Sequence, residues 1–236
     1  MRLLAFETSA KAASAALLED GRLIGEYYQN SGQTHSRTVM KLAKDLLDNC
    51  DLSPADVDVI AYANGPGSFT GIRIGVAAAK GFCWGAELPC VPVSTLEAMA
   101  FSHCGSDGTV CCCMDARRSQ VYNAVFSVRN GSVYRLREDR AISVEELGED
   151  LRSVEGPVRL VGDGAALVYA ALSEQLPDLI LAPEHLRQQR ASGVALAAWK
   201  AVQEGSTQDP AVTLPNYLRL SQAERERLAK EKYKGE

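Results

Sequence analysis

The stretch from Asn64 to Gly85 constrains the fold of this chain more than any other. It opens with Asn-Gly-Pro-Gly-Ser-Phe, in which two glycines and a proline require a tight turn. Ser68, the fifth of these residues, is of a type that accepts hydrogen bonds from the first free N–H groups of a helix. The apolar side chains that follow point to every side of a helix, so the predicted helix has to be buried on two sides.

One arc of this predicted helix carries only small residues, namely Gly71, Gly75, Ala78 and Ala79. Small side chains let another backbone approach closely, although a glycine inside a helix costs about 1 kcal/mol relative to alanine. Two interpretations fit this arc. The residues alone favour a central helix packed on its own neighbours, and the alternative is a helix that docks a partner.

The composition excludes several classes of protein. The chain has 236 residues with 25 basic and 30 acidic side chains, a net charge of −5 and no polybasic run, which is a poor basis for independent RNA binding. No stretch of about 18 apolar residues lacks a charge, and the N-terminus has the pattern of a buried strand. We therefore expect a cytoplasmic protein with no membrane segment. The seven cysteines form no C-x-x-C pair and indicate small buried side chains.

The first half of the chain predicts three strands and then alternating helices and strands. Strands are predicted at residues 2–7, 12–19, 22–29, 57–63 and 89–93, and helices at residues 34–50, 68–85 and 95–101. The apolar arc of the first helix is wider than burial against one sheet requires, so part of it is left over for contact with a partner. This order suggests a mixed sheet covered by helices.

The second half repeats this layout crudely, with strands before helices. Strands are predicted at residues 109–115, 120–128, 132–137, 158–161 and 179–181, and helices at residues 144–152, 165–175 and 187–204. A duplicated α/β architecture follows, with one subdomain over residues 1–105, a second over 106–220 and a charged tail over 221–236.

No arrangement typical of catalysis is visible. The histidines at 35, 103 and 185 are far apart, and Gly162-Asp163-Gly164 is too short a glycine pattern to define a nucleotide site. The turn Glu7-Thr8-Ser9 has hydroxyl and N–H groups that suit a phosphate, but threonine and serine are as common in ordinary turns. Either distant residues build a site or the chain does not catalyse.

Four segments resemble the bacterial TsaB family, also called YeaZ. They are Leu4 to Ser9, Asn64 to Gly75, Met114 to Arg118 and Pro215 to Arg219. The resemblance extends over nearly the whole chain, and the total length also fits. The glycine-proline segment is quite specific when it follows a hairpin start of this kind.

The resemblance implies a fold, a function and partners. The fold is the duplicated α/β fold of the actin, sugar-kinase and heat-shock ATPase (ASKHA) superfamily. The function is a non-catalytic role in making threonylcarbamoyladenosine on tRNAs that read codons starting with A. In this family the transferase is the paralogous subunit TsaD, and the ATPase TsaE joins the pair. The resemblance therefore implies a complex with both, homodimers in the absence of TsaD, and tRNA contact only through the complex; direct contacts from Arg117, Arg118 or the tail are left open.

The resemblance also implies where the subunits meet. The first two helices of each protein pair into a four-helix bundle, and the matching segments here are residues 34–50 and 68–85. The candidate partner-binding residues are Val39, Ala43, Leu46, Gly71, Ile72, Gly75, Val76, Ala78, Ala79 and Phe82. The surplus apolar arc and the small-residue arc agree with this interpretation.

Two differences from the catalytic relative, TsaD, argue against catalysis by this chain. Where that relative holds a metal with two histidines, Thr95 and Met99 provide a hydroxyl and a thioether, which are poor ligands for iron or zinc, so we predict no metal. The glycine pairs for an adenine nucleotide are also missing, so Glu7, Thr8 and Ser9 are predicted to be a vestigial phosphate loop without a cofactor. The alternatives are a nucleotide-dependent enzyme of the same fold and a metal-dependent peptidase-like protein.

Overall fold

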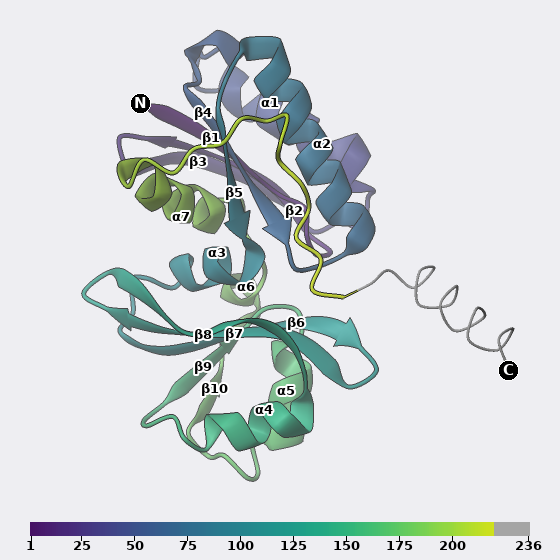
Figure 1. The fold of residues 1–236 in the computed structure, drawn as a ribbon, viewed down its shortest axis with the longest axis vertical. Coiled ribbons are helices and arrows are strands. Elements are labelled where there is room, and N and C mark those ends of the chain that lie inside the picture. Colours follow the sequence, from purple (N-terminus) through teal and green to yellow (C-terminus); the bar gives the residue numbers. More distant parts are fainter. Residues whose placement is uncertain (220–236) are drawn as a thin grey trace, which may run out of the picture.

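The computed structural model describes residues 1–219 and shows two five-stranded mixed sheets, one above the other, with helices packed against them (Figure 1). The predicted charged tail at 221–236 lies outside the described residues. The first sheet has the order β3-β2-β1-β4-β5, with β1 (Arg2–Glu7), β2 (Ala13–Glu19), β3 (Arg22–Gln29), β4 (Val59–Gly65) and β5 (Cys90–Ser94). The second has the order β10-β9-β6-β7-β8, with β6 (Gly108–Arg117), β7 (Gln120–Arg129), β8 (Ser132–Ser143), β9 (Val158–Val161) and β10 (Leu179–Leu181).

The two sheets have the same topology. Strand β1 pairs antiparallel with β2 and parallel with β4, as β6 does with β7 and β9. Strands β3 and β5 then extend the first sheet in the same way as β8 and β10 extend the second. This match, strand for strand, confirms the predicted duplicated α/β architecture of the ASKHA type.

The helices form layers outside and between the sheets. One apolar cluster joins α1 and α2 to the outer face of the first sheet, and another joins α4 and α5 to the outer face of the second. A third cluster contains side chains of both sheets together with α3 and α7, which lie between them (Figure 1). The helices are α1 (His35–Asp48), α2 (Phe69–Ala86), α3 (Thr95–Phe101), α4 (Val144–Leu151), α5 (Ala165–Leu172), α6 (Glu184–Arg187) and α7 (Ala191–Gln203), with a 3-10 turn at Pro54–Asp56.

Two predicted boundaries differ because of contacts that are distant in sequence. Strand β8 continues to Ser143, well past the predicted end, since it pairs with β7 along its length. The helix predicted at 187–204 begins only at Ala191, after a break that separates α7 from α6. In this break Arg187 O accepts the N–H of Gly162 at 2.7 Å and the Gln189 side chain donates to Asp163 at 3.0 Å.

The last part of the described chain returns to the first sheet. Helix α7 packs on β1, β2, β4 and β5, although it belongs to the predicted second subdomain. We call each sheet with the helices packed on its outer face a lobe. Residues 205–219, which we call the strap, continue along the lobe of the first sheet. Gln208 pairs with Cys90, Thr213 bonds the hydroxyl of Tyr62, and the strap ends beside the start of α2. The division at residue 105 stays a prediction.

A carboxylate on β3 fixes the start of α7. Glu26 Oε1 accepts from both the N–H and the hydroxyl of Ser192 at 3.0 Å, while Oε2 accepts from Arg190 at 3.1 Å. The Glu26 side chain is only 11% exposed, so this ion pair is shielded from water. Glu26 therefore caps α7 through Ser192, which lies 166 residues later in the chain.

We expect Glu26→Ala to lower the free energy of unfolding by about 2–4 kcal/mol, because α7 loses its cap and Arg190 is left without its partner. Urea denaturation measures this. The matched control is Glu19→Ala, which breaks the more exposed pair with Arg2 and should cost about 1 kcal/mol or less. Equal losses for the two variants would contradict the assigned role of Glu26.

Candidate functional site

The turn after β1 packs directly against the start of α2. The Thr8 hydroxyl donates to Gly71 O at 2.8 Å, and the N–H of Ser68 donates to Ser9 O at 2.7 Å. A Cβ atom on Gly71 would lie 2.1 Å from Thr8 O, and one on Gly75 would lie 2.4 Å from Thr8 Oγ1. These two glycines therefore allow close packing inside the subunit.

This packing buries most of the predicted partner-binding set within the subunit, and the set as a whole stays a prediction. Eight of the ten residues are buried in the core of the subunit itself, namely Val39, Ala43, Leu46, Gly71, Ile72, Gly75, Val76 and Ala79. The apolar side chains of α1 and α2 pack on the first sheet and on one another. These eight side chains are unavailable to a partner in this structure, whereas Ala78 and Phe82 are half-buried.

The opposite side of α2 carries a second series of small residues. Ala77, Gly81 and Gly85 recur every four residues and are exposed, and a Cβ on either glycine would meet nothing within 4 Å. Apolar side chains flank the series, including Trp84, which is 63% exposed. We call this surface the outer face, and it comprises Ile74, Ala77, Ala78, Gly81, Phe82, Trp84 and Gly85.

The sequence interpretation missed Ala77, Gly81, Trp84 and Gly85. The four-residue spacing of the small residues was the available signal, since residues four apart lie on one side of a helix. That signal is ambiguous, because α2 has a small-residue arc on each of two sides. Met40 of α1, exposed by 43%, was also read only as part of the buried arc.

The strap runs beside α2 and stacks on its first turn. The ring of Tyr217 lies on the ring of Phe69 with centroids 4.5 Å apart. Arg73 covers the Phe69 ring at 4.0 Å and donates to the Tyr217 hydroxyl at 2.8 Å. These contacts join the end of the described chain to the start of α2.

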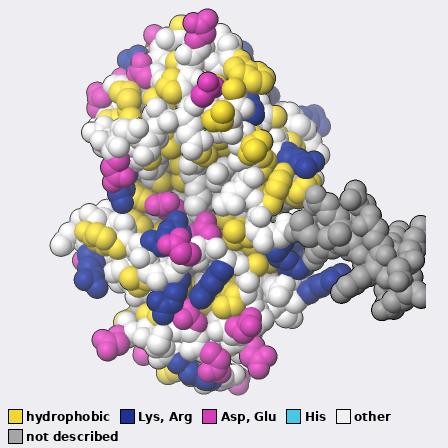
Figure 2. All heavy atoms as spheres, in the orientation of Figure 1, with side chains coloured by type: hydrophobic (Ala, Val, Ile, Leu, Met, Phe, Trp, Pro, Cys, Tyr) yellow, Lys and Arg dark blue, Asp and Glu magenta, His cyan; other side chains and the backbone are white. Residues whose placement is uncertain are grey.

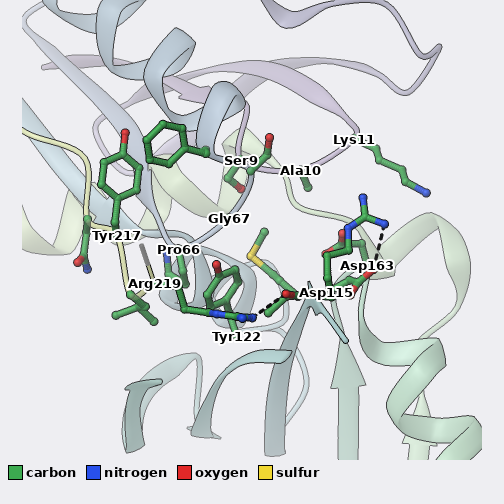
Figure 3. Close-up of a pocket in the computed structure, with 17 residues that line it drawn as sticks. Ser9, Ala10, Lys11, Pro66, Gly67, Asp115, Tyr122, Asp163, Tyr217 and Arg219 are labelled. Atoms are coloured by element: carbon green, nitrogen blue, oxygen red, sulfur yellow. Dashed lines mark hydrogen bonds and ion pairs between the residues drawn. The ribbon is translucent and has the colours of Figure 1, made fainter. Parts of the chain in front are cut away.

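A cleft of about 460 Å³ opens between the lobes, at the first turn of α2 (Figure 3). Its lining comes from the β1–β2 turn, the β6–β7 hairpin, the β9–α5 turn and the strap. Asp115 and Asp163 line it, and burial raises the pKa of Asp163. Glu7 is fully buried next to it, and burial, with a contribution from the charge of Asp163, raises the pKa of the Glu7 carboxyl to about 7.

The residues present do not fit the phosphates of a nucleotide. The Thr8 hydroxyl is already bonded to Gly71, and Glu7 places a carboxyl directly behind the predicted phosphate loop. A Cβ on Gly162 would lie 2.1 Å from Cys113 O, so this glycine is required for packing of the β9–α5 turn on β6. Only the Ser9 hydroxyl, which is buried and has no partner among residues 1–219, is left as a donor in the loop.

The positions that would correspond to metal ligands are packed between the lobes. Thr95 is fully buried and Met99 is 3% exposed, and both belong to the interlobe layer. Within residues 1–219, no group of three or more His, Cys, Asp or Glu side chains is arranged to hold a metal ion. The predicted absence of a metal rests on the chemistry of these two side chains. No helix among the described residues is both long and apolar enough to span a membrane.

Comparison with known proteins identifies the family. A protein from Bacillus subtilis described as tRNA threonylcarbamoyladenosine biosynthesis protein TsaB is 33% identical over 95% of this chain and 96% of its own. The chain belongs to the TsaB family. A protein of the same description from Escherichia coli is 34% identical over 70% of this chain and 72% of its own. The family model for TsaD, tRNA N6-adenosine threonylcarbamoyltransferase, matches residues 27–227.

The fold of this TsaB-family chain also matches a solved structure. YeaZ from Pseudomonas aeruginosa superposes with a TM-score of 0.78 at 27% identity, over 92% of this chain and 99% of that one. The resemblance inferred from the four sequence segments is thereby confirmed, and it places the protein in tRNA threonylcarbamoyladenosine biosynthesis.

The two glycines on opposite sides of α2 should respond to alanine with opposite signs. Gly75→Ala should lower the free energy of unfolding by about 1–3 kcal/mol, because its Cβ collides with Thr8. Gly81→Ala should raise it by about 0.5–1 kcal/mol, since the new methyl group meets nothing and alanine favours helix. Chemical denaturation measures both, and a stabilising Gly75→Ala would refute the contact with Thr8.

The buried Glu7 predicts a pH dependence of stability. Its folded-state pKa lies above its ordinary value of 4.5, so the folded chain binds the proton more tightly than the unfolded chain. The Glu7 contribution to stability should therefore fall as the pH rises from about 4.5 to about 7. We expect Glu7→Gln to stabilise the protein by about 1–3 kcal/mol at pH 8 and to change it little at pH 4.5. Urea denaturation across this range checks the result, and a pH-independent effect would contradict it.

Proposed function

We propose that this protein is a non-catalytic subunit that docks and activates a TsaD-type threonylcarbamoyl transferase, with a TsaE-type ATPase joining the pair in the cytoplasm. The observation that carries the proposal is the outer face of α2, which exposes two glycines inside an 18-residue helix. A glycine in a helix costs about 1 kcal/mol relative to alanine, and no contact among residues 1–219 requires these two. A helix of another subunit packed on them supplies a reason.

The geometry of this face suits helix-on-helix packing. Small residues at four-residue spacing let two helix axes approach closely, and the flanking Ile74, Phe82 and Trp84 provide apolar area to bury. A paralogous subunit of the same fold would present its own first two helices. The TsaD family model matches most of this chain, which supports a partner with such helices.

The same face also supports the predicted homodimer. In a two-fold pair the same patch serves both copies, so the outer face would meet itself when the transferase is absent. The two assemblies would then compete for one surface, and only one of them leads to modified tRNA.

The absence of catalysis in this subunit is supported by its side chains. The interlobe cleft is lined with carboxyl groups, and the donors of the Glu7-Thr8-Ser9 turn do not fit a phosphate. Thr95 and Met99 offer a hydroxyl and a thioether where the transferase has histidines. These features disfavour both the nucleotide-dependent and the peptidase-like alternative. The proposed subunit takes part in tRNA modification only within the complex.

A bulky side chain on the outer face should break the complex without unfolding the subunit. We expect Gly81→Leu to weaken binding of the TsaD-type transferase by about 10- to 100-fold, because overpacking a close helix contact costs about 1–3 kcal/mol. The control is Ala170→Leu, which places a leucine on the exposed side of α5. Binding is measured by calorimetry, and folding of each variant by circular dichroism.

An unchanged affinity for Gly81→Leu, with the fold intact, would remove the outer face from the interface. The non-catalytic role has its own test, in which tRNA is incubated with the purified subunit and the threonylcarbamoyl donor. Modification without the transferase would show that the chain itself catalyses the reaction.

A further inference from the structure

The tip of the β6–β7 hairpin has an unusual backbone. Two-residue hairpin loops need positive φ angles, for which Asn-Gly and Asp-Gly are the favourable residues. The chain uses these pairs in its β2–β3 and β7–β8 hairpins, with Asp20-Gly21 and Asn130-Gly131. At the β6–β7 tip the residues in this conformation are Arg117, Arg118 and Ser119, with φ of +67°, +57° and +55°.

Positive φ angles at arginine and serine strain the backbone. Such strain clusters at functional sites, where the side chains bind or react. The side-chain oxygen Oδ1 of Asp115 accepts the N–H of Arg117 at 2.7 Å, which holds the turn in place. The Arg117 side chain is 85% exposed, and Arg118 is exposed beside it. The hairpin thus presents two guanidinium groups on a rigid support.

More cations lie around the same opening. Lys11, Arg117 and Arg219 line the interlobe cleft. Figure 3 shows Lys11 and Arg219 on separate elements at the cleft. Arg219 is held there by its hydrogen bond to the carbonyl oxygen of Ala116 at 2.8 Å. Among residues 1–219, the closest carboxylate contact of these cations is that of Arg117 with Asp115, at 3.9 Å. The positive charge at the mouth is therefore largely uncompensated locally.

The interior of the cleft has the opposite character. Asp163 lines it and the fully buried Glu7 lies next to it, so a phosphate inside would meet carboxyl groups. The cations lie at the rim of the cleft and the carboxyl groups lie inside it. This distribution suits an anion that lies across the opening, whereas an anion that entered the cleft would meet carboxyl groups. An extended polyanion fits this distribution better than a free nucleotide does. The rings of Tyr122 and Tyr217 at the same opening add surfaces on which an unpaired base can stack.

We infer that the cleft mouth is an RNA-binding surface, where Arg117, Arg118, Lys11 and Arg219 contact phosphates of the tRNA that the complex modifies. The identity of the RNA rests on the proposed function. The contacts would position the tRNA backbone without reading its sequence, as cationic side chains on phosphates do.

The test is binding of a fluorescently labelled, unmodified tRNA transcript as salt is varied. It is done with the full chain alone at low salt and with its complex with the transferase. Arg117→Gln combined with Arg118→Gln should weaken binding about tenfold and reduce the slope of log K against log salt by about 1.5, since each phosphate contact contributes about 0.7–0.9. The control combines Arg22→Gln with Lys200→Gln, which removes the same charge from exposed sites on other elements.

A second variant separates RNA contact from damage to the fold. Arg118→Asn combined with Ser119→Gly supplies the favourable turn residues, so it should raise the melting temperature while it weakens RNA binding. Equal RNA affinity and equal salt slope for the wild type and the Gln variant would overturn the inference. Loss of transferase binding instead of RNA binding would also overturn it, because the arginines would then contact protein.

The two proposals fail differently. If the wild-type chain does not pair with the transferase by size-exclusion chromatography, the proposed function fails, and the titration of the chain alone still decides the RNA contact. If the complex forms normally and only the RNA comparison shows no difference, the RNA contact fails and the proposed function stands.

Discussion

The contact between the β1 turn and the two glycines of α2 determines how the rest of the first lobe is used. Thr8 lies so close to Gly71 and Gly75 that no side chain fits between the turn and the helix. The same contact occupies the Thr8 hydroxyl, which belongs to the phosphate loop predicted from the sequence. It also fixes the orientation of α2, on which Ala77, Gly81 and Gly85 are exposed. One packing contact thus engages the Thr8 hydroxyl and leaves Ala77, Gly81 and Gly85 at the surface of the described residues.

Two helices hold the lobes together, because each follows one sheet in sequence and packs on the other. Helix α3 follows the first sheet yet packs on β6 and β7, while α7 follows the second sheet and packs on the first. Glu26 anchors α7 to β3, and the strap then reaches the cleft beside the start of α2. Large opening of the lobes would break these contacts. This rigidity suits a docking subunit, because a preorganised surface loses little conformational entropy on binding.

The sequence predicted the fold closely where local patterns decide it. The first three strands and the helix at 95–101 were predicted with at most one residue of error, since the hydrophobic period and the turn residues agree there. The break between α6 and α7 was missed because it depends on the distant Gly162 and Asp163. The choice between two small-residue arcs of α2 failed for a similar reason. Each arc permits close approach, and only the fold shows that Thr8 occupies one of them.

Helix α2 connects the two surfaces for which roles are proposed. Its first residue, Phe69, lies at the cleft mouth, and its outer face continues to Gly85, about 24 Å further along at 1.5 Å per residue. Space-filling atoms show apolar side chains on the upper lobe and Lys and Arg side chains near the junction of the lobes (Figure 2). A transferase docked along α2 would therefore sit next to tRNA held at the mouth. A subunit without chemistry of its own would then act by position, because it brings the substrate backbone within reach of the partner that reacts with it.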